Sequence, residues 1–125
     1  ESHKDSCRSF KSLGHKRFLS AIQAVDVVMG NSSAGIVEVP SFCKATINLG
    51  NRQEGRIQAS STINCAENKN EILEALNIVY SGDFQSTLEF VVNPYGEGNT
   101  SEKALEILKR VDLSSIIKKK FFDKK

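Results

Sequence analysis

The sequence predicts an α/β domain built on a parallel sheet. Short apolar runs at residues 25–29, 45–49 and 62–65 have the length of strands, and they alternate with segments of helical spacing. This alternation is typical of βαβ units, which form parallel sheets. With 125 residues, of which 39% are hydrophobic, the chain has the length of one domain and enough apolar side chains for a core.

The first expected helix begins near His15, because the apolar side chains that follow are spaced to share one helical face: Phe18, Leu19, Ile22 and Val25. The run 25–29 then predicts a short buried strand. Small residues at 30–35 open a second helix, and Ser32 or Ser33 can serve as its N-cap. Pro40 should kink or end this helix, because proline lacks an N–H group and its ring clashes with the preceding turn.

The second expected strand, Ala45–Leu49, is mostly apolar and partly β-branched, and it leads into the loop Gly50–Arg56. Thr62–Cys65 is the third expected strand. A helix should follow it, capped by Asn68 or Asn70, with an apolar stripe formed by Ile72, Leu73, Leu76, Val79 and Tyr80. The position of Gly82 is typical of a C-cap glycine.

Residues 84–92 fit neither a helical nor a strand pattern clearly, and residues 93–99 are rich in turn formers. Thr100 or Ser101 should cap a last helix whose inward side chains are Ala104, Leu105, Leu108 and Val111.

Charge and composition narrow the class of protein. Residues 114–125 hold five lysines and one aspartate, so the net charge of +2 arises in this tail and the rest of the chain carries −2. Nucleic-acid binding is therefore disfavoured. No apolar run reaches the roughly 20 residues that cross a bilayer, and no signal-peptide pattern opens the chain, so we expect no membrane association. Three widely spaced cysteines without a CxxC pattern fit the cytoplasm better than a disulfide framework or a zinc site.

Two loops are expected at the ligand-binding edge of the sheet, since both Asn31–Gly35 and Gly50–Arg56 follow strands. Backbone N–H groups of Ser33 to Gly35 and the hydroxyl groups of Ser32 and Ser33 could hold a phosphate. A plain helix start with a serine N-cap is the alternative. Arg52 is the candidate cation, because its planar guanidinium can grip phosphate oxygens in two places; a surface arginine is the alternative.

Glu38 lies beyond the first turn of that helix, where its carboxylate could accept hydrogen bonds from a polyol such as ribose. An exposed helical glutamate is the alternative. His15 is a lone histidine near a helix start and is more typical of a structural residue than of a catalytic one. The sequence contains no Ser-His-Asp set, paired carboxylates or metal-ligand cluster, so it indicates binding chemistry without a catalytic centre.

Four segments together resemble the carboxy-terminal domain of the hydrolysing UDP-N-acetylglucosamine 2-epimerases, in particular the branch that serves sialic-acid and nonulosonate synthesis. They are Gly30–Ile36, Pro40–Phe42, Ile47–Arg56 and Asn93–Asn99. The resemblance implies a Rossmann-like domain, one half of a GT-B architecture, with a UDP-sugar bound between two such domains. It also implies the reaction: UDP is eliminated through a glycal-like intermediate, and water is added to give N-acetylmannosamine. No cofactor is implied.

The resemblance also implies roles for single residues. It places Ser32, Ser33, Gly35 and Arg52 on the diphosphate, Glu38 on the ribose, and Leu13 (through its backbone) and Phe18 against the uracil. The sequence departs from the family pattern at Ala34, where a serine is usual, and at Cys43 and Ala45, where glycine and proline are usual. Asn51 stands where the family often has aspartate.

The family's acid/base carboxylates belong to the amino-terminal domain, and its hinge histidine precedes the matching region, so neither can be assigned here. With the abrupt polar start at Glu1, this leads us to expect a fragment: residues 1–112 as the UDP-binding domain and 113–125 as a lysine-rich tail. Its expected partners are UDP or UDP-N-acetylglucosamine and an amino-terminal Rossmann-like domain. A homo-oligomer, a diacetamido sugar substrate, a non-catalytic regulatory module and a GT-B glycosyltransferase remain open.

Overall fold

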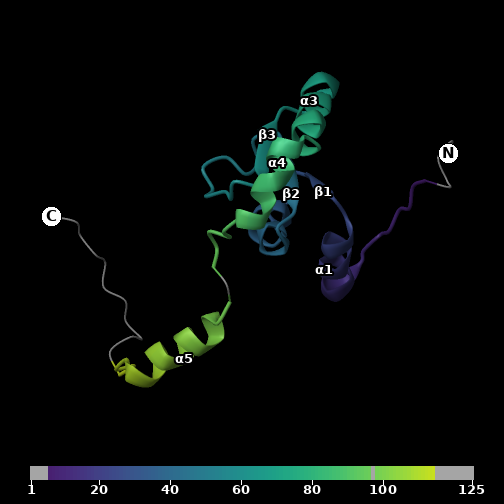
Figure 1. The fold of residues 1–125 in the computed structure, drawn as a ribbon. Helices are drawn as coiled ribbons and strands as arrows, with labels where there is room; N and C mark the ends of the chain where they lie inside the picture. The colour runs from purple at the N-terminus through teal and green to yellow at the C-terminus, as the bar shows by residue number, and fades with distance from the viewer. Residues whose placement is uncertain (1–5, 97, 115–125) are drawn as a thin grey trace.

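The computed structural model describes residues 6–96 and 98–114, and it confirms the predicted α/β fold with a parallel sheet (Figure 1). Its sheet has the strand order β1-β2-β3, and both strand pairs are parallel. Along the chain the elements are α1 (Gly14–Ala24), β1 (Val27–Gly30), α2 (Ala34–Val37), η1 (Val39–Phe42), β2 (Ala45–Leu49), β3 (Thr62–Cys65), α3 (Lys69–Val79), α4 (Gly82–Thr87), η2 (Leu88–Phe90) and α5 (Thr100–Arg110).

Strands β2 and β3 have the predicted bounds, whereas β1 begins two residues later than expected, at Val27. In the register Val27 pairs with Ala45 and Thr46 with Thr62. The expectation that the first strand is buried is wrong within the described chain. There β1 is an edge strand with β2 as its neighbour, and Met29 is 41% exposed.

The core lies on both faces of β2, because alternate side chains of a strand point to opposite faces. On one face Ala45 and Ile47 pack against Ala75 and Val79 of α3. On the other face Thr46 meets α2. Ile36 of α2 and Val39 of η1 are fully buried. The sheet is therefore covered by helices on both sides, which leaves the ends of its strands as the place for a ligand.

Of three helix boundaries, one agrees with its expected position and two differ. Asn68 caps α3 as one of the two predicted candidates, and its side chain accepts a hydrogen bond from the Glu71 N–H. Gly82 is not a C-cap: it is the first residue of α4, and the Ser81 hydroxyl accepts the Phe84 N–H at 3.3 Å. The unassigned residues 84–92 thus fall mainly into α4 and η2. Asn99, in the left-handed conformation, precedes α5 in place of Thr100 or Ser101.

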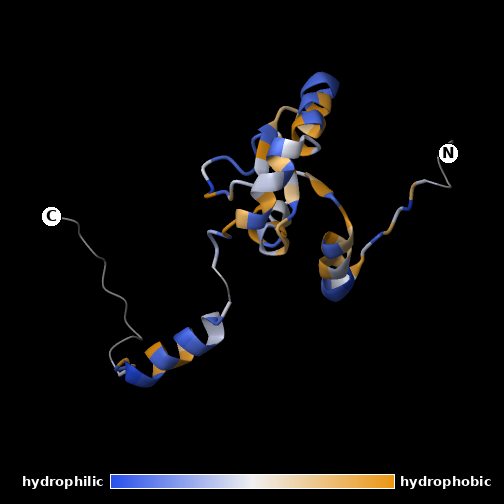
Figure 2. Cartoon of the chain, viewed as in Figure 1, coloured by the Kyte–Doolittle hydropathy of each residue, from blue (hydrophilic) through white to orange (hydrophobic). Residues whose placement is uncertain are grey.

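Helix α5 forms at the expected place but does not pack inward. All of its residues are exposed, including the predicted inward set, and Leu108 is 56% exposed. Figures 1 and 2 show α5 standing away from the sheet, with hydrophobic and hydrophilic residues along it. Most of the lysine tail, from residue 115 on, lies outside the described residues. None of the helices in the described ranges is long and apolar enough to cross a membrane.

Candidate functional site

The two loops expected at one edge of the sheet are joined by a hydrogen bond. The Nε2 group of Gln53 donates to the carbonyl oxygen of Asn31 at 2.7 Å, and Gln53 is only 3% exposed. This bond ties the loop after β2 to the turn after β1. Arg52 is the chain neighbour of the buried Gln53, so its backbone lies at this edge, while the residue itself is exposed to solvent.

The turn after β1 uses part of its hydrogen-bonding capacity internally. The Ala34 N–H donates to the Ser32 hydroxyl at 3.3 Å, and the Gly35 N–H donates to the Ser32 carbonyl at 3.2 Å. Of the three N–H groups expected to face a phosphate, that of Ser33 is the one without a partner among the described residues. Since α2 is only four residues long, its positive end contributes little, and Arg52 must supply most of the attraction for an anion.

Gly35 has a packing role that the local sequence did not indicate. A Cβ atom at this position would lie 2.7 Å from Cγ2 of Thr46, and the Thr46 hydroxyl donates to the Gly35 carbonyl at 2.7 Å. Helix α2 thereby rests directly on β2. As predicted, the α-helix does not continue through Pro40: α2 ends at Val37, and Pro40 lies in the 3-10 helix η1 that follows.

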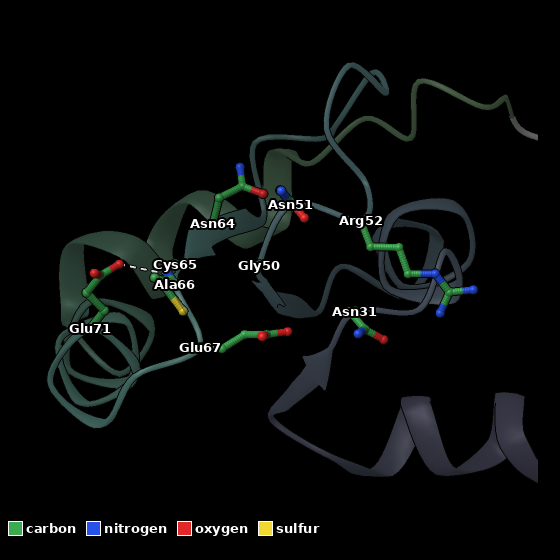
Figure 3. Close-up of a pocket in the computed structure, with 9 residues that line it drawn as sticks. All are labelled: Asn31, Gly50, Asn51, Arg52, Asn64, Cys65, Ala66, Glu67 and Glu71. Carbon is green, nitrogen blue, oxygen red and sulfur yellow. Dashed lines mark hydrogen bonds between the residues drawn. The ribbon is translucent and has the colours of Figure 1, made fainter.

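A pocket of about 770 Å³ opens beside the turn and the Gly50–Arg56 loop (Figure 3). In this view Arg52 and Glu67 extend on opposite sides of Asn31. The side-chain amides of Asn51 and Asn64 also line the pocket. Polar amides, one cation and carboxylates thus surround a single open space.

Glu38 lines a second hollow, of about 340 Å³, with His15 of α1 and Tyr95. Its Oε2 atom is buried and has no hydrogen-bond partner among the described residues. A buried carboxylate oxygen without a partner is costly, and a ligand hydroxyl group would satisfy it.

The loop 93–99 borders the hollow beside Glu38 and is tied to it by side chains whose roles the sequence did not reveal. Asn93 donates from Nδ2 to the Val37 carbonyl at 2.8 Å and to the Ser41 hydroxyl at 2.6 Å. The Tyr95 hydroxyl donates to the Ile57 carbonyl at 3.0 Å. Asn93 and Tyr95 are separated from their partners by dozens of residues, so no local pattern could predict these bonds. Glu97 of this loop lies outside the described residues.

The two residues expected near uracil belong to the start of the chain. Leu13 is the half-buried residue before α1. Phe18, on α1, is half-buried and lines a hollow of about 180 Å³ with Gly30, Ser32 and Gly35. Phe18 therefore lies beside the turn after β1 that contains Ser32 and Ser33, the serine turn. Leu13 lines none of the three hollows described here.

Hydrogen bonds shift the pKa of Glu71, which lies at this end of the sheet. Its carboxylate accepts the Ala66 N–H at 2.7 Å and the Asn68 side-chain amide at 2.8 Å, and these bonds lower its pKa, that of Ala66 most. Burial, and secondarily the nearby Glu71 charge, raises the pKa of the Cys65 thiol. Cys65 thus contributes an uncharged thiol group to the wall of the pocket. The described residues contain no group of three or more His, Cys, Asp or Glu side chains arranged to hold a metal ion.

Comparison with known proteins identifies the relatives of the chain. The model of the family described as UDP-N-acetylglucosamine 2-epimerase matches residues 1–109. The chain is 36% identical over 108 residues to the polysialic acid biosynthesis protein P7 of Escherichia coli, covering 82% of the chain and 28% of that protein.

Two further relatives carry the name of a hydrolysing 2-epimerase. A UDP-N,N'-diacetylbacillosamine 2-epimerase of Legionella pneumophila is 36% identical over 117 residues, 88% of the chain and 28% of the relative. A GDP/UDP-N,N'-diacetylbacillosamine 2-epimerase of Campylobacter jejuni is 35% identical over 123 residues, 98% of the chain and 31% of the relative. The chain thus spans about a third of the length of the relatives that it matches. It belongs to the UDP-N-acetylglucosamine 2-epimerase family.

Proposed function

We propose that this chain is the UDP-binding half of a hydrolysing UDP-N-acetylglucosamine 2-epimerase, which releases UDP and forms N-acetylmannosamine. The observation that carries the proposal is the hydrogen bond from Gln53 to Asn31, because it holds the Arg52 loop against the serine turn. One cation and a turn with an available N–H group, at the carboxyl edge of a parallel sheet, suit a diphosphate.

In this proposal the parts of UDP follow the edge of the sheet. Ser32, Ser33 and Arg52 hold the diphosphate, and Gly35 lets the turn lie close against β2. The Glu38 carboxylate accepts the ribose hydroxyl groups, and the unpartnered Oε2 atom supports this role. Phe18 and the backbone of Leu13 face the uracil. These residues bind the leaving group of the reaction, while the groups that transfer protons belong to an amino-terminal Rossmann-like domain.

The diphosphate assignment is tested by calorimetry of UDP with the chain and with Arg52→Ala. We expect weak binding that the substitution reduces by about 1–3 kcal/mol, because a charge-assisted contact is lost. Arg110→Ala on the exposed helix α5 is the control, since it removes the same charge far from the site. Equal affinity of Arg52→Ala and the unmodified chain would overturn the role of Arg52.

The ribose assignment has its own readout. Glu38→Ala should weaken the binding of UDP and abolish the preference for UDP over 2'-deoxy-UDP, because no carboxylate would accept a hydrogen bond from the 2'-hydroxyl group. Arg52→Ala should weaken the binding of both nucleotides equally. If Glu38→Ala keeps the full preference, the carboxylate does not hold the ribose.

The complete reaction is tested by joining the chain to the amino-terminal domain of a hydrolysing relative. Release of UDP with N-acetylmannosamine from UDP-N-acetylglucosamine is the expected result. Because the relatives from Legionella and Campylobacter are named for UDP-N,N'-diacetylbacillosamine, this diacetamido sugar nucleotide is the second substrate to assay. UDP binding without turnover of either sugar would favour a non-catalytic module, and transfer to an acceptor sugar would favour a glycosyltransferase.

A further inference from the structure

We infer that the pocket beside Asn31 and Arg52 binds the sugar of a UDP-linked 2-acetamido sugar, and that the Glu67 carboxylate accepts hydrogen bonds from its hydroxyl or amide groups. This inference rests on the proposed function and extends it to the sugar. It concerns Glu67, a residue to which the family resemblance assigns no role.

The first argument is that the large pocket adjoins the proposed diphosphate site. Glu38 lines the hollow of about 340 Å³, Ser32 the hollow of about 180 Å³, and Asn31 with Arg52 the pocket of about 770 Å³. Because Asn31 is the neighbour of Ser32 and Arg52 itself lines the large pocket, a diphosphate held by Ser32 and Arg52 would lie beside that pocket. Its volume lies within the range of about 300–1,000 Å³ that small-molecule sites have.

The second argument is the chemistry of the pocket wall. Glu67 is on the opposite side of Asn31 from Arg52 in Figure 3, and no hydrogen bond or ion pair to a described residue engages its carboxylate. A carboxylate would repel a phosphate, but it accepts hydrogen bonds well from neutral donors. The Asn64 amide already exchanges hydrogen bonds with Gln58, whereas the Asn51 amide has no hydrogen bond to a described residue and can both donate and accept. This wall suits a neutral, hydroxylated and acetamido-bearing group better than a second anion.

The third argument is that the Glu67 carboxylate lies close to the backbone at Gly50, in the loop Gly50–Arg56. Gly50 has φ +67°, and a Cβ atom on it would lie 3.0 Å from Oε1 of Glu67. A larger residue at Gly50 would push the carboxylate away. The glycine therefore permits both the turn of the loop and the position of the carboxylate beside Asn31.

Calorimetry on the full chain tests the inference, with UDP and UDP-N-acetylglucosamine as the two ligands and their affinity ratio as the readout. Glu67→Ala should lower the affinity for UDP-N-acetylglucosamine by about fivefold and leave that for UDP unchanged or slightly higher, since a negative charge is lost. Glu67→Gln should lower the ratio less, because its amide oxygen still accepts. Glu74→Ala, an equal loss of charge on the exposed side of α3, should leave the ratio unchanged.

The outcomes separate the inference from the proposed function. If UDP does not bind the unmodified chain, the proposed diphosphate site fails, and the sugar pocket fails with it. If UDP binds and Glu67→Ala leaves the ratio unchanged, or Glu74→Ala lowers it equally, the sugar is not held by Glu67, and the diphosphate site stands.

Discussion

The side chain of Gln53 is buried between two loops and donates a 2.7 Å hydrogen bond to the backbone carbonyl of Asn31. The bond spans 22 residues and holds the carboxyl ends of β1 and β2 together beyond the strands. Gln53 itself contacts no proposed ligand. It positions Arg52, its neighbour in the chain, relative to the serine turn.

Gln53→Ala should therefore lower both stability and UDP affinity. It removes a buried side chain and leaves the Asn31 carbonyl without its partner, and we expect the free energy of unfolding to fall by about 1–3 kcal/mol. Urea denaturation followed by circular dichroism measures this change. Gln23→Ala on the exposed face of α1 should stay within about 0.5 kcal/mol of the unmodified chain. A Gln53→Ala chain with unchanged stability would show that the bond does not hold the loops.

The sequence predicts the parts of this fold that depend on local apolar patterns. The bounds of β2 and β3 follow from short β-branched runs, and the meeting of the two loops follows from the parallel order of the strands. Gln53 could not be found in this way, because nothing local distinguishes a glutamine that is buried by a distant loop from an exposed one.

Two helices show other limits of the pattern. Residues 82–87 contain weak helix formers, and α4 forms there with a Ser81 cap and with Phe84 packed against the core. The spacing of Leu105 and Leu108 predicts an apolar face on α5 correctly. It cannot say what covers that face, and in the described chain both side chains remain exposed.

Cys43 has the left-handed conformation, with φ 52° and ψ 38°, at the end of η1. An L-residue with a side chain pays about 1–2 kcal/mol for this conformation, whereas glycine adopts it freely. Because Cys43 is exposed, its side chain adds little packing. Cys43→Gly should raise the free energy of unfolding by about 0.5–1 kcal/mol, after the greater flexibility of glycine in the unfolded chain is subtracted.

Thermal unfolding of Cys43→Gly beside Cys43→Ala distinguishes the backbone from the thiol. Alanine removes the sulfur and keeps the Cβ atom, so we expect no gain from it. Equal stabilisation by both substitutions would assign the effect to the loss of the thiol and contradict the conformational explanation.

The Glu71 carboxylate makes the stability of the chain depend on pH. Its pKa is lowered in the folded chain, chiefly by the Ala66 N–H and then by the Asn68 amide. A lowered pKa means that the folded state favours the ionised form. The resulting stabilisation is present above the ordinary glutamate pKa and is lost as the pH falls through the lower, folded value.

Glu71→Gln should therefore destabilise the chain at pH 7 and have progressively less effect as the pH is lowered from about 5 to 3. The measurement is the free energy of unfolding at several pH values for both chains. Glu74→Gln on the same helix should give a curve parallel to that of the unmodified chain. A pH-independent difference for Glu71→Gln would mean that the ionised carboxylate does not stabilise the start of α3.

The contact between Gly35 and Thr46 sets how closely α2 approaches β2. Gly35→Ala places a methyl group only 2.7 Å from the Thr46 Cγ2 atom, and this clash should lower the free energy of unfolding by about 1–3 kcal/mol. Gly82→Ala is the matched control, because no atom lies within 4 Å of the added carbon and its φ is not left-handed. It should be neutral or stabilise α4 slightly.

Thr46→Ser removes the methyl group and keeps the hydroxyl that donates to the Gly35 carbonyl. In the double variant the methyl group added by Gly35→Ala can fill the space, so the two substitutions should couple favourably by about 0.5–3 kcal/mol. Additive costs in urea denaturation would show that the steric contact does not limit how closely α2 approaches β2.

The double variant also tests the role of Gly35 in binding. If Gly35 serves the diphosphate site only by allowing this approach, UDP affinity should recover together with stability. Recovered stability without recovered affinity would instead assign Gly35 a direct place against the phosphates.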